Sequence, residues 1–242
     1  MAHPNVMPPV AIIGMGCMFP KSADLKAYWR LLLHGEDAIT DVPPTHWSIG
    51  DYYDPNPKTP DHTYCHRGGF LSSVMFDPTE FGIPPNSLEA TDSTQILALL
   101  VAKEALRDAG YDGRRPFNRE RTSVILGVTG SQELVIPLGA RLGFPHWRRA
   151  LQASGIPAEK SDEIIQRMSR AYVPWRENSF PGLLGNAHAG RICNRIDLGG
   201  TNCVVDAACA SSMSAVHLAM LELVSGRSDM VLTGCAATLN DI

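Results

Sequence analysis

The stretch VVDAACASSMSAVHLAM, from Val204 to Met220, holds a cysteine among small residues. The run Thr201 to Ala207 has the β-branched composition of a strand, and the run Cys209 to Gly226 has the apolar spacing of a helix that ends at a glycine. Small neighbours allow a sharp turn between such elements, as in a nucleophile elbow. The sequence therefore predicts Cys209 at the head of a helix.

Two interpretations of Cys209 stay open on the residues alone. Free N–H groups and the macrodipole at a helix start favour negative charge and so enrich the thiolate, which is the attacking form. Such a thiolate can take an acyl group from a thioester, and the same N–H groups help to hold the oxyanion. The alternative is a small core cysteine, which is common. We expect that ordinary role for the other cysteines: Cys17, Cys65, Cys193, Cys203 and Cys235.

Strands and helices alternate along the rest of the chain. Further strands are predicted at 9–16, 122–128 and 229–235, and further helices at 25–35, 92–110 and 181–196. Residues 40–90 are rich in turn-forming residues and predict a long irregular excursion, while 131–178 predicts a helical insertion. This alternation indicates a layered α/β fold.

Composition excludes several classes of protein. The 242 residues carry a formal net charge of −4 with 44% hydrophobic residues, which is typical of a globular chain. No face is strongly basic, so nucleic acid is not the expected partner. No apolar run approaches the roughly 18 residues of a membrane span, and the amino terminus lacks a signal-peptide pattern. The six cysteines form no C-x-x-C pair, which predicts reduced thiols and a cytoplasmic protein.

At the cysteine the sequence resembles a known family. VVDAACASSMSAVHLAM is similar to the active-site signature of the β-ketoacyl synthases, the condensing enzymes of fatty-acid and polyketide synthesis. VAIIGMGCMFP, WRLLLHGEDAITDVP, YCHRGGFL, AKEALRDAG and AGRICNRIDLGG also match the family in order. FGIPPNSLEATDSTQ and AYVPWRENSFPGLLGN look most like the first ketosynthase domain of polyunsaturated fatty acid synthases, with TDSTQ where a modular polyketide synthase has a DPQ-type motif.

The resemblance implies a thiolase-like layered fold, with a mixed sheet and buried helices, and a homodimer. Residues 1–242 would be a single N-terminal half-domain, truncated, with the helical insertion at about 131–178. The family moves an acyl chain from the phosphopantetheine of an acyl carrier protein to the cysteine, here Cys209. A malonyl thioester then loses carbon dioxide and attacks the acyl group. Two histidines of the family's second half serve that step, so no residue here inherits their roles. No cofactor is expected in this domain, and the fragment alone is expected to be inactive.

Two other functions remain as alternatives. A non-catalytic partner similar to the chain-length factors would shape a pocket or a dimer, although those relatives have lost the nucleophilic cysteine that Cys209 represents. A thiolase-type acyltransferase would use coenzyme A thioesters without a carrier protein.

The histidines are weaker candidates than Cys209. His217 follows the cysteine by eight residues in the same predicted helix. At 1.5 Å per residue it lies about 12 Å along the axis, beyond the roughly 3 Å reach of a general base. His188 falls in a glycine-rich helix that resembles a structural motif. We expect both histidines to be packed or surface residues.

Three further patterns mimic functional motifs. His62, Cys65 and His66 suggest a metal, but a tetrahedral site needs a fourth ligand and none is evident. Gly14 and Gly16 follow a predicted strand like a dinucleotide fingerprint, but the third glycine is missing. The hydroxyls of Ser211 and Ser212 lack a visible base and are expected to satisfy N–H groups at the helix start.

Overall fold

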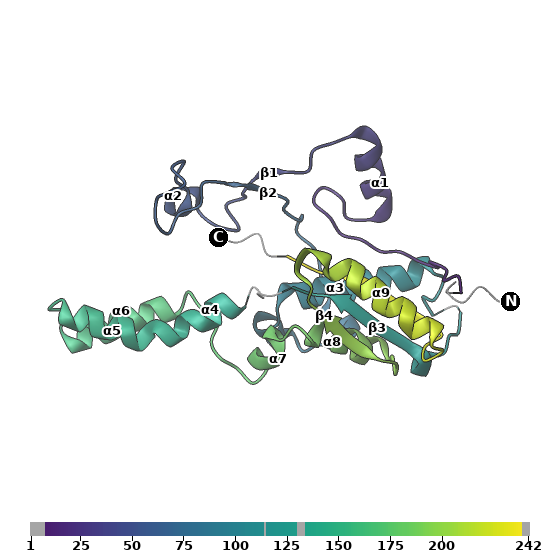
Figure 1. Cartoon of the computed structure of the whole chain (residues 1–242). Coiled ribbons are helices and arrows are strands. Elements are labelled where there is room, and N and C mark those ends of the chain that lie inside the picture. The colour runs from purple at the N-terminus through teal and green to yellow at the C-terminus, as the bar shows by residue number, and fades with distance from the viewer. Residues whose placement is uncertain (1–7, 114, 130–133, 239–242) are drawn as a thin grey trace. The chain divides into compact units, whose positions relative to one another are not determined.

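The computed structural model describes residues 8–113, 115–129 and 134–238 (Figure 1). The chain divides into two compact units. The first contains the residues up to Phe76 together with Leu100–Phe117, and the second contains Asp77–Leu99 and Asn118–Thr238. The boundary at Leu99 and Leu100 falls inside helix α3 (Ser93–Asp108).

A parallel three-stranded sheet forms the centre of the second unit. Its strands are β3 (Thr122–Gly127), β4 (Asn202–Val205) and β5 (Met230–Cys235), in the order β4-β3-β5. The register pairs Gly127 with Val205 on one side and with Cys235 on the other, so the three carboxyl ends meet at one edge. Every residue of β3 is buried, as the predicted strand at 122–128 requires.

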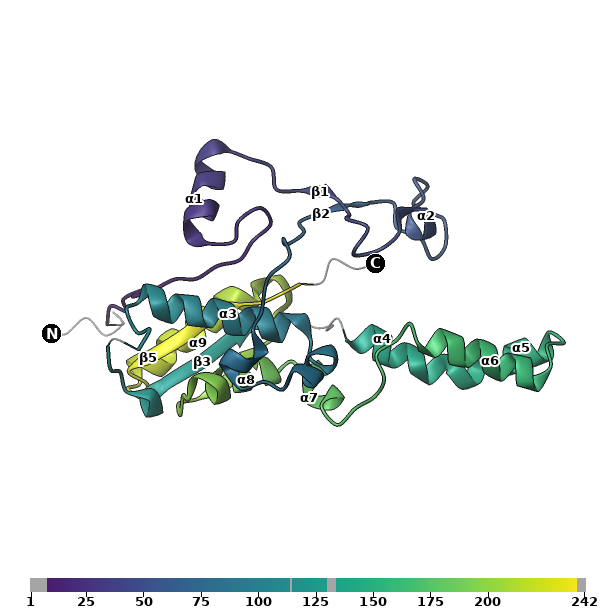
Figure 2. The same ribbon diagram turned by 180° about the vertical axis from the view of Figure 1, so that it is seen from behind.

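Helices cover both faces of this sheet. α8 (Ala187–Ile196) packs on β3 and β4, and α9 (Ser211–Val224) packs on β5 and β3. The chain steps from β3 outward to β4 and then back across β3 to β5. Parallel crossovers in proteins are right-handed as a rule, so steps in opposite directions place their helices on opposite faces of the sheet (Figures 1 and 2).

Small residues let α9 approach the sheet. Ala215 and Ala219 are buried in this helix, which packs on β3 and β5. Its other side leaves apolar side chains exposed, including Met213, which is 71% exposed. The helix is therefore apolar on more than the face that the described residues cover.

The predicted helix at 181–196 is wrong, because the structure divides it. α7 (Ser179–Leu183) ends before α8 begins, and Leu184 between them is extended with ψ 129°. The Gln95 amide, Nε2, donates to the carbonyls of Pro181, Gly182 and Leu184 at 3.1, 2.9 and 3.3 Å. A buried side chain thus takes the place of the helical hydrogen bonds at the break.

The segment predicted as a helical insertion contains three helices. They are α4 (Val135–Ala140), α5 (Phe144–Ala153) and α6 (Ala158–Ser169), with the 3-10 turn η4 (Arg141–Gly143) before α5. α5 packs against α6, where Arg148 pairs with Asp162. Residues 131–133 of the predicted insertion lie outside the described residues. None of the described helices combines the length and apolarity that crossing a bilayer requires.

The first unit holds little regular structure. α1 (Leu25–His34) is capped by Asp24, whose Oδ1 accepts the Ala27 N–H at 2.7 Å, and it ends at the left-handed Gly35. The excursion predicted at 40–90 contains α2 (Ile49–Tyr52) and the antiparallel pair β1 (Thr40–Asp41) and β2 (Arg67–Gly68). Short 3-10 turns lie in the second unit: η1 (Pro78–Phe81), η2 (Pro85–Ala90) and η3 (Arg119–Arg121).

The strand predicted at 9–16 is wrong for the described residues 9–16, which form no strand. They lie against α3 instead. A Cβ on Gly14 would stand 2.5 Å from the Ala105 carbonyl oxygen, and one on Gly16 would stand 2.7 Å from the Val101 carbonyl oxygen. The two glycines therefore serve close backbone packing, and the strand that a dinucleotide fingerprint needs is missing from this segment.

Candidate active site

The turn between β4 and α9 is sharp and strained at one residue. Ala208 has φ +48°, in the left-handed region that costs a residue with a Cβ about 1–2 kcal/mol. A single 3-10 turn, η5 (Ala208–Ala210), follows and leads directly into α9. Cys209 is the middle residue of η5, so it lies immediately before the helix, as the sequence predicts.

The hydroxyl of Ser211 holds this turn together. Ser211 Oγ accepts the Ala207 N–H at 2.9 Å and donates to the Ala208 carbonyl at 2.7 Å. Thr129, which follows β3, lies 3.1 Å from Ser211 Oγ through its own hydroxyl and 3.3 Å from the Ala208 carbonyl. The expectation that Ser211 satisfies helix-start N–H groups is therefore wrong, because its hydroxyl bonds to the turn before the helix.

A glycine lets the start of α9 reach the sheet. A Cβ on Gly127, the last residue of β3, would stand 2.6 Å from the Ser211 carbonyl carbon and 2.9 Å from the Ser212 nitrogen. Those distances are too short for any side chain. Sequence reasoning missed Gly127 and Thr129, although Gly127 lies near the end of the strand predicted at 122–128 and Thr129 directly follows it.

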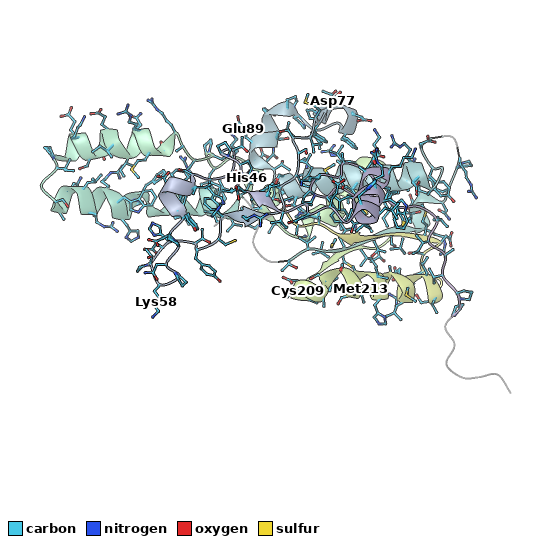
Figure 3. The ribbon with its side chains drawn as sticks, turned by 90° about the horizontal axis from the view of Figure 1, so that it is seen from above. His46, Lys58, Asp77, Glu89, Cys209 and Met213 are labelled. Carbon is cyan, nitrogen blue, oxygen red and sulfur yellow. The ribbon has the colours of Figure 1, made fainter. Side chains whose placement is uncertain are left out.

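Cys209 is exposed at this turn (Figure 3). The N-cap residue of α9 is Ala210, whose methyl side chain cannot accept a hydrogen bond from the N–H groups at the helix start. Met213 follows Cys209 by four residues and is also exposed, so the two side chains belong to one side of the helix start. The arrangement offers an accessible thiol, uncapped helix N–H groups and an apolar neighbour.

Three of the other cysteines are held in their protonated form. Burial raises the pKa of the Cys193 thiol to about 11. Burial, followed by the charge of Glu222, raises the pKa of Cys203, and burial, followed by Asp24, raises that of Cys17. Cys65 and Cys235 are exposed, so the expectation of a buried core role is wrong for them.

The histidines named from the sequence contact other groups. His188 is fully buried in α8, with Nδ1 2.8 Å from the Gly185 carbonyl, and burial lowers its pKa. His217 is exposed on α9. His62 contacts the Pro60 carbonyl, and His66 lies 3.5 Å from Asp41. Across the described parts of the chain, no group of three or more metal-ligating side chains occurs.

Comparison with known proteins matches nearly the whole chain to one family. Residues 7–241 match the family described as Beta-ketoacyl synthase, N-terminal domain. One polypeptide of the polyunsaturated fatty acid synthase of Thraustochytrium is 38% identical over 235 residues, which are 96% of this chain and 8% of that protein. The phthioceranic/hydroxyphthioceranic acid synthase of Mycobacterium tuberculosis is 32% identical over 99% of this chain and 10% of its own length.

Solved ketosynthase structures have the same fold. The oxazolomycin ketosynthase domain of Streptomyces albus superposes with a TM-score of 0.70 and 25% identity, over 94% of this chain and 34% of that one. The ketosynthase from module 6 of the bacillaene synthase of Bacillus subtilis superposes with a TM-score of 0.68 and 28% identity, over 95% of this chain and 32% of that one. The chain thus spans a tenth or less of these curated relatives and about a third of the solved chains.

These matches confirm the family and the thiolase-like α/β fold that the sequence predicts. The chain belongs to the β-ketoacyl synthase family, and it corresponds to that family's N-terminal domain.

Proposed function

We propose that the chain is part of a β-ketoacyl synthase and that Cys209 is its acyl acceptor. The observation that carries this proposal is the exposed thiol at a strained turn, directly before an uncapped helix. The Cys209 thiolate attacks the carbonyl carbon of an acyl thioester. The carbon–sulfur bond to the carrier then breaks, and the released carrier thiolate takes a proton. Met213 supplies apolar surface beside the new thioester.

The second stage is a decarboxylative condensation. A malonyl thioester loses carbon dioxide, and the carbanion so formed attacks the acyl carbon on Cys209, whose sulfur leaves as thiolate. The relatives named for polyunsaturated fatty acid and phthioceranic acid synthesis support this reaction class. The product class, fatty acid or polyketide, follows from the substrate and not from the described residues.

The partners follow from the reaction. We propose that acyl and malonyl groups arrive on an acyl carrier protein and that the complete domain forms a homodimer. No cofactor takes part in either stage. All six cysteines are free thiols, which supports a reducing, cytoplasmic location.

Acyl transfer is tested on a complete synthase domain that contains this chain, because the fragment alone is expected to be inactive. The protein is incubated with an acyl-pantetheine thioester and then digested, and the peptides are weighed by mass spectrometry. We expect one acyl group on the Cys209 peptide, none in Cys209→Ala, and an unchanged adduct in Cys235→Ala, which removes another exposed thiol. An equal adduct in Cys209→Ala would reject Cys209 as the acceptor. Acylation of the complete synthase without release of carbon dioxide from malonyl thioester would favour the non-catalytic alternative.

A further inference from the structure

A cavity of about 220 Å³ lies in the second unit. The residues that line it come from other parts of the sequence than the β4–α9 turn. Its apolar wall is formed by Ile83, Pro84 and Pro181. Its polar wall includes Asn178 and two arginines of α8, Arg191 and Arg195. The β4–α9 turn contributes no lining residue, so this cavity is not the site of Cys209.

The two arginines have no acidic partner among the residues described. Arg191 Nε donates to the Gln95 amide oxygen at 2.8 Å, and Arg195 Nη1 donates to the Gly82 carbonyl at 3.1 Å. Both acceptors are neutral, and neither guanidinium forms an ion pair with a described carboxylate. Each guanidinium carries five N–H donors, so both keep donors for a ligand.

The positive charges also repel each other. Arg191 and Arg195 are four residues apart on one helix, where like charges destabilise the helix. Burial, and then the charge of Arg195, lowers the pKa of Arg191. Arg191 is half-buried and Arg195 is exposed. An anion in the space that both line would relieve their repulsion and offset the burial of Arg191.

Neighbouring acids are already engaged. Glu89, at the end of η2 (Figure 3), pairs with Arg176 at 2.7 Å. Asp92 is buried and accepts the N–H groups of Thr94 and Leu134 at 2.9 and 3.3 Å. Neither carboxylate is in ion-pair contact with Arg191 or Arg195, so the positive charge of the cavity remains.

We propose that this cavity binds the phosphate of a small phosphate monoester between the guanidiniums of Arg191 and Arg195. Two forked cations match the two negative charges and the oxygens of a monoester dianion. The Asn178 amide lines the same space, and the wall of Ile83 and Pro181 suits a small organic group. The volume equals about seven waters at roughly 30 Å³ each, enough for a phosphate with a short carbon chain. This site is independent of the proposed acyl transfer.

The test measures binding to the whole chain by calorimetry, at pH 7.5 and constant ionic strength. The probes are glycerol 3-phosphate as the monoester, dimethyl phosphate as the diester and acetate as the carboxylate. We expect saturable binding of the monoester and at least tenfold weaker binding of the other two. Affinity should fall about tenfold at pH 5, because the second phosphate pKa is about 6. Equal affinity for dimethyl phosphate, or no binding of the monoester, would overturn the proposal.

Variants assign the site. Arg195→Gln should weaken the monoester at least tenfold, and Arg195→Lys should weaken it less, since it keeps the charge and loses the fork. Arg191→Gln provides an independent second variant. Arg167→Gln removes an exposed arginine of α6 and should bind like the parent chain. Unchanged affinity in both Arg195→Gln and Arg191→Gln would contradict the assignment. Because these experiments measure phosphate binding and not acylation of Cys209, a negative result leaves the proposed function untouched.

Discussion

At the scale of single residues, the Cys209 turn depends on atoms that sequence neighbours do not supply. Gly127 and Ser211 are 84 positions apart, yet a Cβ on the glycine would collide with the backbone of the serine. Small residues around Cys209 identify the turn from the sequence. Nothing in the local pattern marks Gly127 as the surface on which the turn rests.

Gly127→Ala should therefore destabilise the protein by about 1–3 kcal/mol, because α9 must move away from β3. Urea unfolding measures the change. Gly234→Ala, one strand away in β5, is the matched control, since nothing lies within 4 Å of its added Cβ. The control should gain about 0.5–1 kcal/mol from reduced chain entropy. A Gly127→Ala protein as stable as the control would refute the close contact.

Ser211→Ala should cost about 1–3 kcal/mol, because it leaves the Ala207 N–H without its acceptor and removes one donor to the Ala208 carbonyl. The turn should loosen, so acylation of Cys209 should slow as well. Ser212→Ala removes a neighbouring hydroxyl for which no hydrogen bond occurs within the described ranges, and it should change little. Equal effects of the two substitutions would argue against the role assigned to Ser211.

At the scale of elements, hydrophobic periodicity predicted the helices and strands whose position depends on nearby residues. α1, α3, β3, β4 and β5 lie where their periodicity places them, and α9 follows a 3-10 turn within its predicted range. The helix at 181–196 was wrong because Gln95, far away in sequence, captures its carbonyls. The strand at 9–16 was wrong because a strand needs a partner, and these residues lie against a helix.

His188 in α8 gives a prediction for pH. Burial lowers its pKa below the ordinary 6.5, opposed by the Gly185 carbonyl and by Asp92 and aided by Arg191. As pH falls below 6.5, the unfolded chain gains a proton that the folded chain refuses, so stability falls from 6.5 down to the folded pKa. We expect the free energy of unfolding to decrease between about pH 7.5 and 5.5.

His188→Asn should reduce that decrease, while its amide can still donate to the Gly185 carbonyl. His217→Asn, which changes an exposed histidine of α9, should keep the parent slope. Urea titrations at three pH values provide the comparison. The same slope in His188→Asn as in the parent chain would assign the pH dependence to other groups.

At the scale of the whole molecule, the six cysteines fall into two classes. Cys65, Cys209 and Cys235 are exposed, whereas Cys17, Cys193 and Cys203 are wholly or partly buried and have raised pKa values. A chromogenic disulfide reagent at pH 7.5 should therefore modify three thiols quickly in the native chain and all six in denaturant. Cys209→Ala should reduce the rapid class to two, and a rapid class that stays at three would show that Cys209 is shielded.

The central position of β3 has a consequence for synthesis of the chain. β3 ends at Gly127, and its first partner strand begins at Asn202, about 75 residues later. A ribosome adding about 5–20 residues per second needs roughly 4–15 s to reach it. Throughout that interval a segment that is buried in the folded protein has been synthesised with neither edge paired. The nascent chain therefore offers a chaperone its clearest target at residues 122–127, before Cys209 has been translated.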